Sequence, residues 1–202
     1  MVAWFNNGGP FMWPILIVGI FGVIIAIERF ISLIKTKTAT TLFLKNIGST
    51  LKDEGVEAAK EVCRTTPGSI SQIYLAGLSR VDKGSEAVEK AVESAGSIEM
   101  SFLEKNMVWL STVSTLAPML GFTGTVAGMV SAFDAIAAAN DISPAVVAGG
   151  ISQALLTTLF GLVVAMIIQT SQNFFMWIID GVIVKMEETS IELVDTLESM
   201  SS

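Results

Sequence analysis

The chain has 202 residues, of which 51% are hydrophobic, a mean hydropathy of +0.65 and a net charge of −7. It is too apolar for an ordinary soluble domain, and its negative charge argues against nucleic acid as a partner. Histidine, the commonest general base and metal ligand, is absent. Because no nucleophile–base pair, metal-ligand cluster or phosphate-binding loop is visible either, we expect no enzymatic activity, no cofactor and no metal site.

Three uncharged stretches are long enough to cross a bilayer. The first runs from Phe11 to Ile27, the second from Asn106 to Phe133, and the third follows Ser143-Pro144 and ends at Ile179. Ser143-Pro144 is typical of a helix start, with serine as the N-cap and proline in the first helical position. Because a helix rises ~1.5 Å per residue and the hydrocarbon core is ~30 Å thick, ~20 residues suffice. The second and third spans exceed this length, so we expect them to tilt or to project beyond the lipid.

The positions of the basic residues indicate the orientation. All twelve Lys and Arg lie within residues 29–105 or at Lys185, and the positive-inside rule places such regions in the cytoplasm. Charges follow the first apolar segment instead of preceding it, which favours a retained helix over a cleaved signal peptide. The sequence therefore predicts an all-α, multi-pass membrane protein with its N-terminus outside. Its expected parts are an outer N-terminal segment (1–10), transmembrane helix 1 (11–33), a cytoplasmic helical region (34–105), transmembrane helix 2 (106–134), an outer loop (135–143), transmembrane helix 3 (144–179) and a cytoplasmic C-terminal helix (180–202).

The expected cytoplasmic region has the spacing of amphipathic helices. Apolar residues recur at helical intervals from Thr41 to Arg64, interrupted at Gly48 and Gly55, and a second helix is predicted from Ile70 to Arg80. The sequence Thr65-Thr66-Pro67-Gly68-Ser69 separates the two.

After Asp82-Lys83-Gly84-Ser85, no convincing stop signal precedes the second span, so we predict one long helix from Ser85 to about Ala135. The C-terminal tail keeps an apolar side and is expected to continue span three. These helices barely enclose a core within one chain, which favours a symmetric oligomer. The single cysteine, Cys63, excludes an intrachain disulfide.

Small and polar residues mark one face of each of the last two spans. In span two they recur every three or four residues, and Gly124 and Gly128 have the spacing that allows two helix backbones to approach closely. Considered alone, such a face indicates helix packing about twice as often as it indicates an ion path. Its members are Ser114, Pro118, Gly121, Thr125, Gly128 and Ala132, and span three carries the matching strip Gly150, Ala154, Thr157, Gly161 and Ala165, with Thr158 beside it.

Two further features concern polar groups near the membrane. Gln153 lies within the third span, where a buried amide either bridges two helices or lines a hydrated cavity. The composition of the span favours neither interpretation. Glu28 and Arg29 at the inner end of span one are interpreted as an interfacial anchor that reaches lipid headgroups. No titratable side chain lies in the central parts of the spans. If protons pass through, the titrating group is expected on a partner chain.

These residues resemble the MotA/TolQ/ExbB proton-channel family. The segment Leu116–Val126, LAPMLGFTGTV, is similar to the family motif A-P-L-L-G-L-L-G-T-V, and Gly150–Ala165 is similar to G-I-x-E-A-L-x-x-T-x-x-G-L-x-x-A. Ile27-Glu28-Arg29 resembles the I-E-R that closes the first helix in many members. Three spans and a large first cytoplasmic loop are typical of the ExbB/TolQ branch, since MotA-type stators have four spans.

The resemblance implies a homo-pentamer in the bacterial inner membrane, with spans two and three of each copy lining a pore. Two helices of an ExbD- or TolR-type single-span partner would occupy that pore and carry a titrating aspartate. Proton flow would then energise a TonB- or TolA-type protein for outer-membrane transport or integrity. The resemblance places Thr125 and Thr158 in the ion path, and Thr157 and Gln153 are also expected to line it. The small-residue spacing described above assigns helix packing to Pro118, Gly121, Gly124, Gly128 and Gly161.

One position departs from the family pattern. Gln153 stands where ExbB and TolQ sequences commonly have glutamate, and an amide cannot hold or release a proton. Either this carboxylate is dispensable here, or the ion takes another route, including sodium coupling. A non-conducting oligomeric membrane scaffold is the alternative function: it accounts for the small-residue faces but not for the recurring amides and hydroxyls of span three.

Overall fold

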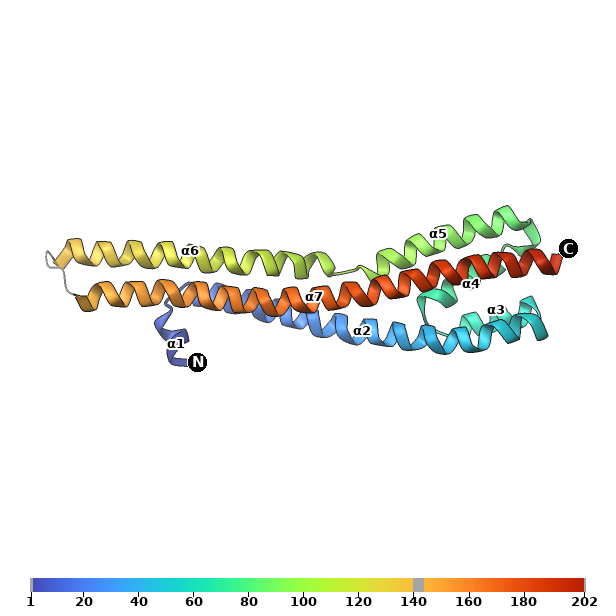
Figure 1. Cartoon of the computed structure of the whole chain (residues 1–202), viewed down its shortest axis with the longest axis horizontal. Helices are drawn as coiled ribbons and strands as arrows, with labels where there is room; N and C mark the ends of the chain where they lie inside the picture. Colours follow the sequence, from blue (N-terminus) through green and yellow to red (C-terminus); the bar gives the residue numbers. More distant parts are fainter. Residues whose placement is uncertain (1, 140–143, 202) are drawn as a thin grey trace. The chain divides into compact units, whose positions relative to one another are not determined.

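The computed structural model describes residues 2–139 and 144–201, which form helices and turns without a strand (Figure 1). Three helical stretches, in α2, α6 and α7, are long and apolar enough to cross a membrane. This confirms the all-helical, multi-pass membrane class. The elements are α1 (Val2–Asn7), α2 (Met12–Asp53), α3 (Val56–Thr65), α4 (Ser69–Leu78), the 3₁₀ helix η1 (Val81–Lys83), α5 (Ser85–Leu103), α6 (Met107–Ala139) and α7 (Pro144–Ser201).

The chain divides into two units. The first unit comprises Met1–Glu28 and Asn106–Asn173, and the second comprises Arg29–Lys105 and Phe174–Ser202. Helices α2 and α7 each contribute residues to both units, whereas α6 belongs to the first unit and α3, α4 and α5 belong to the second.

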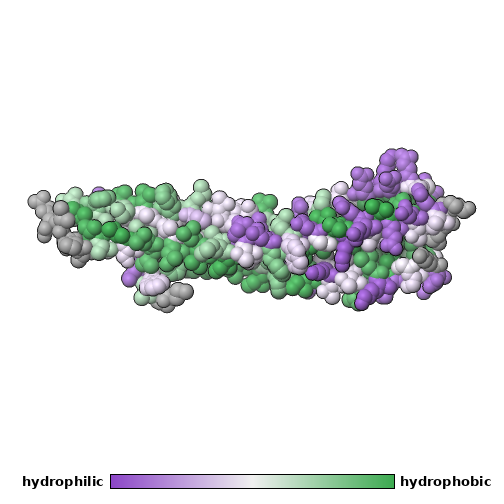
Figure 2. Space-filling view, in the orientation of Figure 1, coloured by the Kyte–Doolittle hydropathy of each residue, from purple (hydrophilic) through white to green (hydrophobic). Residues whose placement is uncertain are grey.

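The first unit presents large apolar side chains outward. Ile17, Phe122 and Leu155 are more than 60% exposed, and green hydrophobic residues cover most of the visible face of this unit (Figure 2). Its buried positions include the small residues Ala117, Ala132 and Ala154. A soluble domain would show the reverse arrangement, because water drives large apolar groups inward. The pattern fits a surface in contact with lipid.

The second unit has an apolar core, and hydrophilic residues, drawn in purple in Figure 2, cover much of its visible face beside smaller apolar patches. The rings of Phe43 and Tyr74 pack edge to face with centroids 5.3 Å apart. The Tyr74 hydroxyl donates a hydrogen bond to the carbonyl oxygen of Thr189, 3.2 Å away, which ties α4 to α7. Leu78 and Leu193 are also almost fully buried. Burial of these side chains stabilises the unit through the hydrophobic effect.

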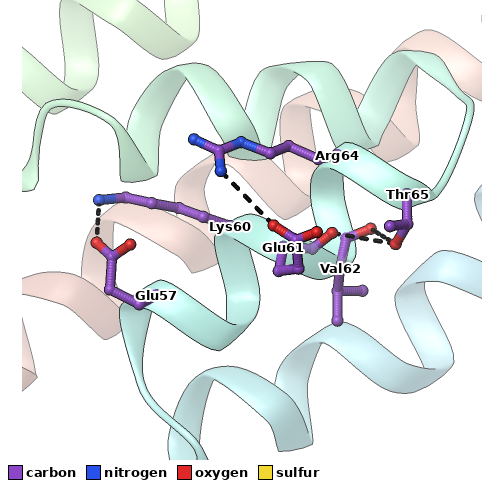
Figure 3. Close-up of polar contacts among 6 residues, drawn as sticks. All are labelled: Glu57, Lys60, Glu61, Val62, Arg64 and Thr65. Carbon is purple, nitrogen blue, oxygen red and sulfur yellow. Dashed lines mark hydrogen bonds and ion pairs between the residues drawn. The ribbon is translucent and has the colours of Figure 1, made fainter.

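Helix α3 shows how the exterior is built (Figure 3). The Lys60 ammonium lies 2.6 Å from the Glu57 carboxylate, and Arg64 lies 3.6 Å from Glu61. The Lys60 hydrogen bond and charge lower the pKa of the Glu57 carboxyl. The Thr65 hydroxyl donates to carbonyl oxygens of its own helix, at Glu61 and Val62. Such surface ion pairs contribute little to stability, so α3 is held mainly by its buried face.

The predicted interruption at Thr65–Ser69 is confirmed: α3 ends at Thr65 and α4 begins at Ser69. The expected continuation of span three is also confirmed, since α7 is unbroken from Pro144 to Ser201. The interruption expected at Gly48 is wrong, because α2 continues through it to Asp53. Gly55, at a φ of +85°, does separate α2 from α3, a backbone conformation that glycine adopts readily.

The prediction of one helix from Ser85 to about Ala135 is wrong. Helix α5 ends at Leu103 and α6 begins at Met107. Asn106 has a φ of +65°, and asparagine is one of the few residues besides glycine that tolerates this left-handed conformation. In the second unit, the buried Arg29 guanidinium donates to the carbonyl oxygen of Lys105 at 2.9 Å. This bond satisfies a carbonyl that the helix no longer pairs.

Residues 135–139 of the predicted outer loop (135–143) are helical. Helix α6 continues to Ala139, because the run Ala137-Ala138-Ala139 has the highest intrinsic helix propensity. Asp134 is therefore an exposed helical residue. The prediction of Ser143 as an N-cap lies outside the described residues, whereas α7 does begin at Pro144.

Candidate functional site

The candidate site lies in the first unit, where α6 and α7 approach closely. A Cβ atom built on Gly121 would lie 2.9 Å from the carbonyl oxygen of Thr157 and 3.1 Å from the Cα of Thr158. One built on Gly161 would lie 2.5 Å from the carbonyl oxygen of Ala117 and 3.1 Å from the Cα of Gly121. Because these neighbours are backbone atoms, the two helices are in backbone contact here, as the small-residue faces predict.

Other glycines extend this contact along the two helices. A Cβ on Gly124 would lie 2.7 Å from the Thr157 side chain, and one on Gly128 would lie 3.2 Å from Ala154. Pro118, on the same helix, is half-buried, and α6 continues through it. The structure thus places the glycines of the packing prediction against the opposite helix.

Two hydroxyl groups meet at this helix–helix contact. The Thr125 hydroxyl of α6 and the Thr158 hydroxyl of α7 are hydrogen-bonded to each other. Thr125 Oγ1 also lies 3.1 Å from the carbonyl oxygen of Ala154 and 3.2 Å from that of Gly121. Thr158 Oγ1 lies 3.3 Å from the same Gly121 carbonyl. Both threonines are only partly buried.

This pair can relay hydrogen bonds, but it cannot itself titrate. Each hydroxyl has one donor and two acceptor lone pairs, so the pair can exchange acceptors among the Gly121 carbonyl, the Ala154 carbonyl and a group outside the chain. No charged side chain lies between Met107 and Phe133 or between Pro144 and Ile179. The site can hydrate an ion path or receive a hydrogen bond from a titrating group that another chain supplies.

The structure does not bring Thr157 and Gln153 into this pair. Thr157 is almost fully buried against α6, and its hydroxyl donates to the carbonyl oxygen of Ala154 at 2.8 Å. The Gln153 amide packs so closely against Gly9 that a Cβ atom on residue 9 would not fit. Gly9 precedes α2 with a φ of +74°. Of the two readings that the sequence left open for Gln153, this contact favours a bridge between chain segments.

Glu28 and Arg29 are the first charged residues of α2. Within the first unit, the Glu28 carboxylate accepts a hydrogen bond from the Asn106 side chain at 3.3 Å. Arg29 is 3% exposed and binds the Lys105 carbonyl within the second unit. The sequence reading missed these two bonds, because Asn106 and Lys105 are more than 70 residues away along the chain. Their role as an anchor to lipid headgroups stays a prediction.

The sequence pattern predicts roles for Thr125 and Thr158 but does not predict the direct bond between them. Their spacing shows that Thr125 lies on the small-residue face of span two and that Thr158 lies beside the small-residue strip of span three. If those two faces are paired, the threonines are neighbours, and this signal was available in the sequence. No group of acidic residues or cysteine among the described residues could hold a metal ion.

Comparison with known proteins gives a consistent family. Residues 66–188 match the model of the MotA/TolQ/ExbB proton channel family. A biopolymer transport protein ExbB homolog from Methanothermobacter thermautotrophicus is 32% identical over 91% of this chain and 65% of its own length. ExbB from Xanthomonas campestris pv. campestris is 36% identical over 55% of this chain and 44% of its own. The Tol-Pal system protein TolQ from Pseudomonas aeruginosa is 36% identical over 45% of this chain and 39% of its own length. The chain thus spans less than two thirds of each of these relatives.

Proposed function

We propose, since the chain belongs to the MotA/TolQ/ExbB proton channel family, that it is the pore-ring subunit of an ion-driven motor of the ExbB/TolQ type. The observation that carries this proposal is the hydroxyl pair of Thr125 and Thr158, which bridges α6 and α7 in a stretch without charged residues. Polar groups in such a stretch raise the free energy of the protein in the membrane unless they take part in helix packing or line a polar path. The pair supplies the acceptors that a titrating partner group needs.

The proposed assembly is a homo-pentamer in a bacterial inner membrane, with the N-terminus outside and the second unit and the C-terminus in the cytoplasm. The distribution of Lys and Arg supports this orientation. Two helices of an ExbD- or TolR-type single-span partner would occupy the pore and supply the aspartate. The names of the relatives, biopolymer transport protein ExbB and Tol-Pal system protein TolQ, support a role in energising a TonB- or TolA-type protein.

The ion path is assigned to Thr125 and Thr158. The prediction that Thr157 and Gln153 also line the path finds no support in their packing, since their side chains lie against α6 and Gly9. Pro118, Gly121, Gly124, Gly128 and Gly161 are assigned to helix packing, for which the close backbone distances at the four glycines are the support.

A proton-flux assay tests the function. The full chain, co-expressed with a candidate single-span partner of the ExbD or TolR type, is reconstituted in liposomes that contain a pH-sensitive dye. We expect Thr125→Ala and Thr158→Ala each to lower the flux at least about tenfold, because a polar group of the path is lost. Thr123→Ala is the matched control, since Thr123 is an exposed threonine of α6 whose hydroxyl donates to the Met119 carbonyl. Unchanged flux in both variants would remove these threonines from the path.

Native mass spectrometry tests the assembly. The same co-expressed preparation is expected to contain five copies of this chain and two partner chains. A monomer or dimer that leaves the partner behind would contradict the motor.

Two alternatives rest on specific observations. Both hydroxyls find acceptors within the chain, at the Gly121 and Ala154 carbonyls, which favours a non-conducting oligomeric scaffold. The scaffold predicts that the two alanine variants lose assembly and that wild type shows no flux. The two hydroxyl oxygens and the two carbonyl oxygens of this contact are hard ligands of the kind that hard cations such as Na⁺ prefer. The flux assay is therefore repeated with a sodium gradient. Sodium-dependent flux without proton uptake would favour the sodium-coupled alternative.

A further inference from the structure

A groove of about 750 Å³ lies in the second unit, between α5 and the C-terminal part of α7. Its floor is apolar, with Val92 and Met186 buried, and Met100 and Ile191 exposed by 40% and 64%. No Lys or Arg among the described residues lines it. Its rim carries five carboxylates, which belong to Glu89, Glu93, Glu187, Asp195 and Glu198.

The acidity of the chain is concentrated at this groove. Helix α5 and residues 174–201 of α7 together contain ten acidic and two basic residues, whereas the remainder of the chain contains nine acidic and ten basic residues. The net charge of −7 therefore originates from the two helical segments that form the groove. Within the described residues, the structure gives no ion pair to Glu89, Glu93, Glu187 or Asp195. Carboxylates gathered in this way repel one another, and a cationic occupant relieves the repulsion.

We propose that this groove binds the basic cytoplasmic arm of the single-span partner, that is, the residues that precede its membrane helix. This inference rests on the proposed function, which supplies the partner and the cytoplasmic position of the second unit. An apolar floor with an acidic rim fits an amphipathic segment with Lys or Arg on one face. The positive-inside rule gives such residues to the cytoplasmic flank of a membrane helix.

The size of the groove also fits this occupant. The α5 residues that line it extend from Glu89 to Met100, which is about 16 Å along the helix axis at ~1.5 Å per residue. A helical segment of about three turns covers that length. Anionic lipid headgroups would be repelled by the rim, and a second copy of this chain would have to bring cationic residues from outside the two acidic segments.

Photo-crosslinking in the assembled complex tests the proposal. The full chain carries p-benzoylphenylalanine in place of Ser97, an exposed residue that lines the groove. It is co-expressed with a candidate single-span partner of the ExbD or TolR type. We expect a covalent adduct with the partner, at a position before the partner's membrane helix. Ser49, an exposed serine of α2 that does not line the groove, is the matched control position and is expected to give no such adduct.

Charge reversal tests the chemistry. Glu93→Lys with Asp195→Lys is expected to lower the Ser97 adduct about tenfold, and changing the arm's Lys and Arg to Glu is expected to restore it. Glu54→Lys with Asp82→Lys changes the net charge equally at exposed residues that do not line the groove, and should leave the adduct unchanged. An arm without excess Lys or Arg would contradict the proposal.

The outcomes separate this inference from the proposed function. A partner that co-purifies but forms no adduct from Ser97 would overturn the groove assignment alone. An adduct between two copies of this chain would overturn it in favour of an interface within the ring. A partner that does not co-purify at all would overturn both proposals.

Discussion

The two units of this chain are held together in opposite ways, although α2 and α7 contribute to both. In the first unit, α6 and α7 meet through glycines and alanines, and large apolar side chains face outward. In the second unit, large side chains such as Leu193 and Tyr74 are buried, and charged residues face outward. The difference teaches that helix pairs in lipid gain stability from close backbone contact, whereas helices in water gain it from burying large apolar groups.

The largest expected effect tests the core of the second unit. Leu193→Ala removes a side chain that is 1% exposed, so we expect a loss of about 3 kcal/mol in the free energy of unfolding, from transfer and cavity terms. The measurement is SDS titration in mixed micelles, followed by circular dichroism. Val184→Ala, at a residue of α7 that is 51% exposed, should change this free energy by less than about 0.5 kcal/mol. Equal losses of unfolding free energy in the two variants would contradict a core that is stabilised by burying large apolar side chains.

The next effect tests the backbone contact of the first unit. Gly161→Ala places a methyl group against the Ala117 carbonyl and the Gly121 backbone, so we expect a loss of about 2 kcal/mol in the same titration. Gly149→Ala is the control in the same helix, because nothing lies within 4 Å of its Cβ position. It should stabilise the helix by up to ~1 kcal/mol, because alanine has the higher helix propensity. A neutral Gly161→Ala would show that the helices are not held by close approach.

An effect of comparable size concerns pH. Burial raises the pKa of the Cys63 thiol from its ordinary 9.0 to about 11. Because the folded state favours the neutral thiol, this contribution to stability is complete below about pH 9 and is lost as the pH rises toward 11. We expect wild type to lose about 1–3 kcal/mol more than Cys63→Ala over this interval, measured by the same titration at each pH. Parallel pH profiles of the two proteins would show that the thiol is not desolvated.

The smallest effect separates packing from conduction at Thr157. Thr157→Val keeps the shape of a side chain that is 1% exposed and loses only a hydrogen bond to its own helix. We expect the free energy of unfolding to change by about 0.5 kcal/mol and the proton flux to stay at the wild-type level. A fall in flux like that expected for Thr125→Ala would place Thr157 in the ion path.

Sequence patterns alone predict the features that depend on local composition. The three spans follow from uncharged length, the interruption at Thr65–Ser69 from Pro67 and Gly68, and the packing faces from small residues at helical spacing. The break at Asn106 was not predicted, because a single asparagine is weak evidence for a left-handed residue and its position is supported by the Arg29 bond to Lys105.

What the sequence by itself determined is therefore the helical membrane class, the number of spans and the small-residue faces, because hydropathy and helical period act over a few turns of one chain segment. Only the tertiary structure decided that Thr125 bonds Thr158, that Gln153 packs on Gly9 and that five carboxylates gather between α5 and α7. These contacts join residues from separate segments of the chain. They depend on which helix faces meet, and the periodicity of a single segment carries no information about that choice.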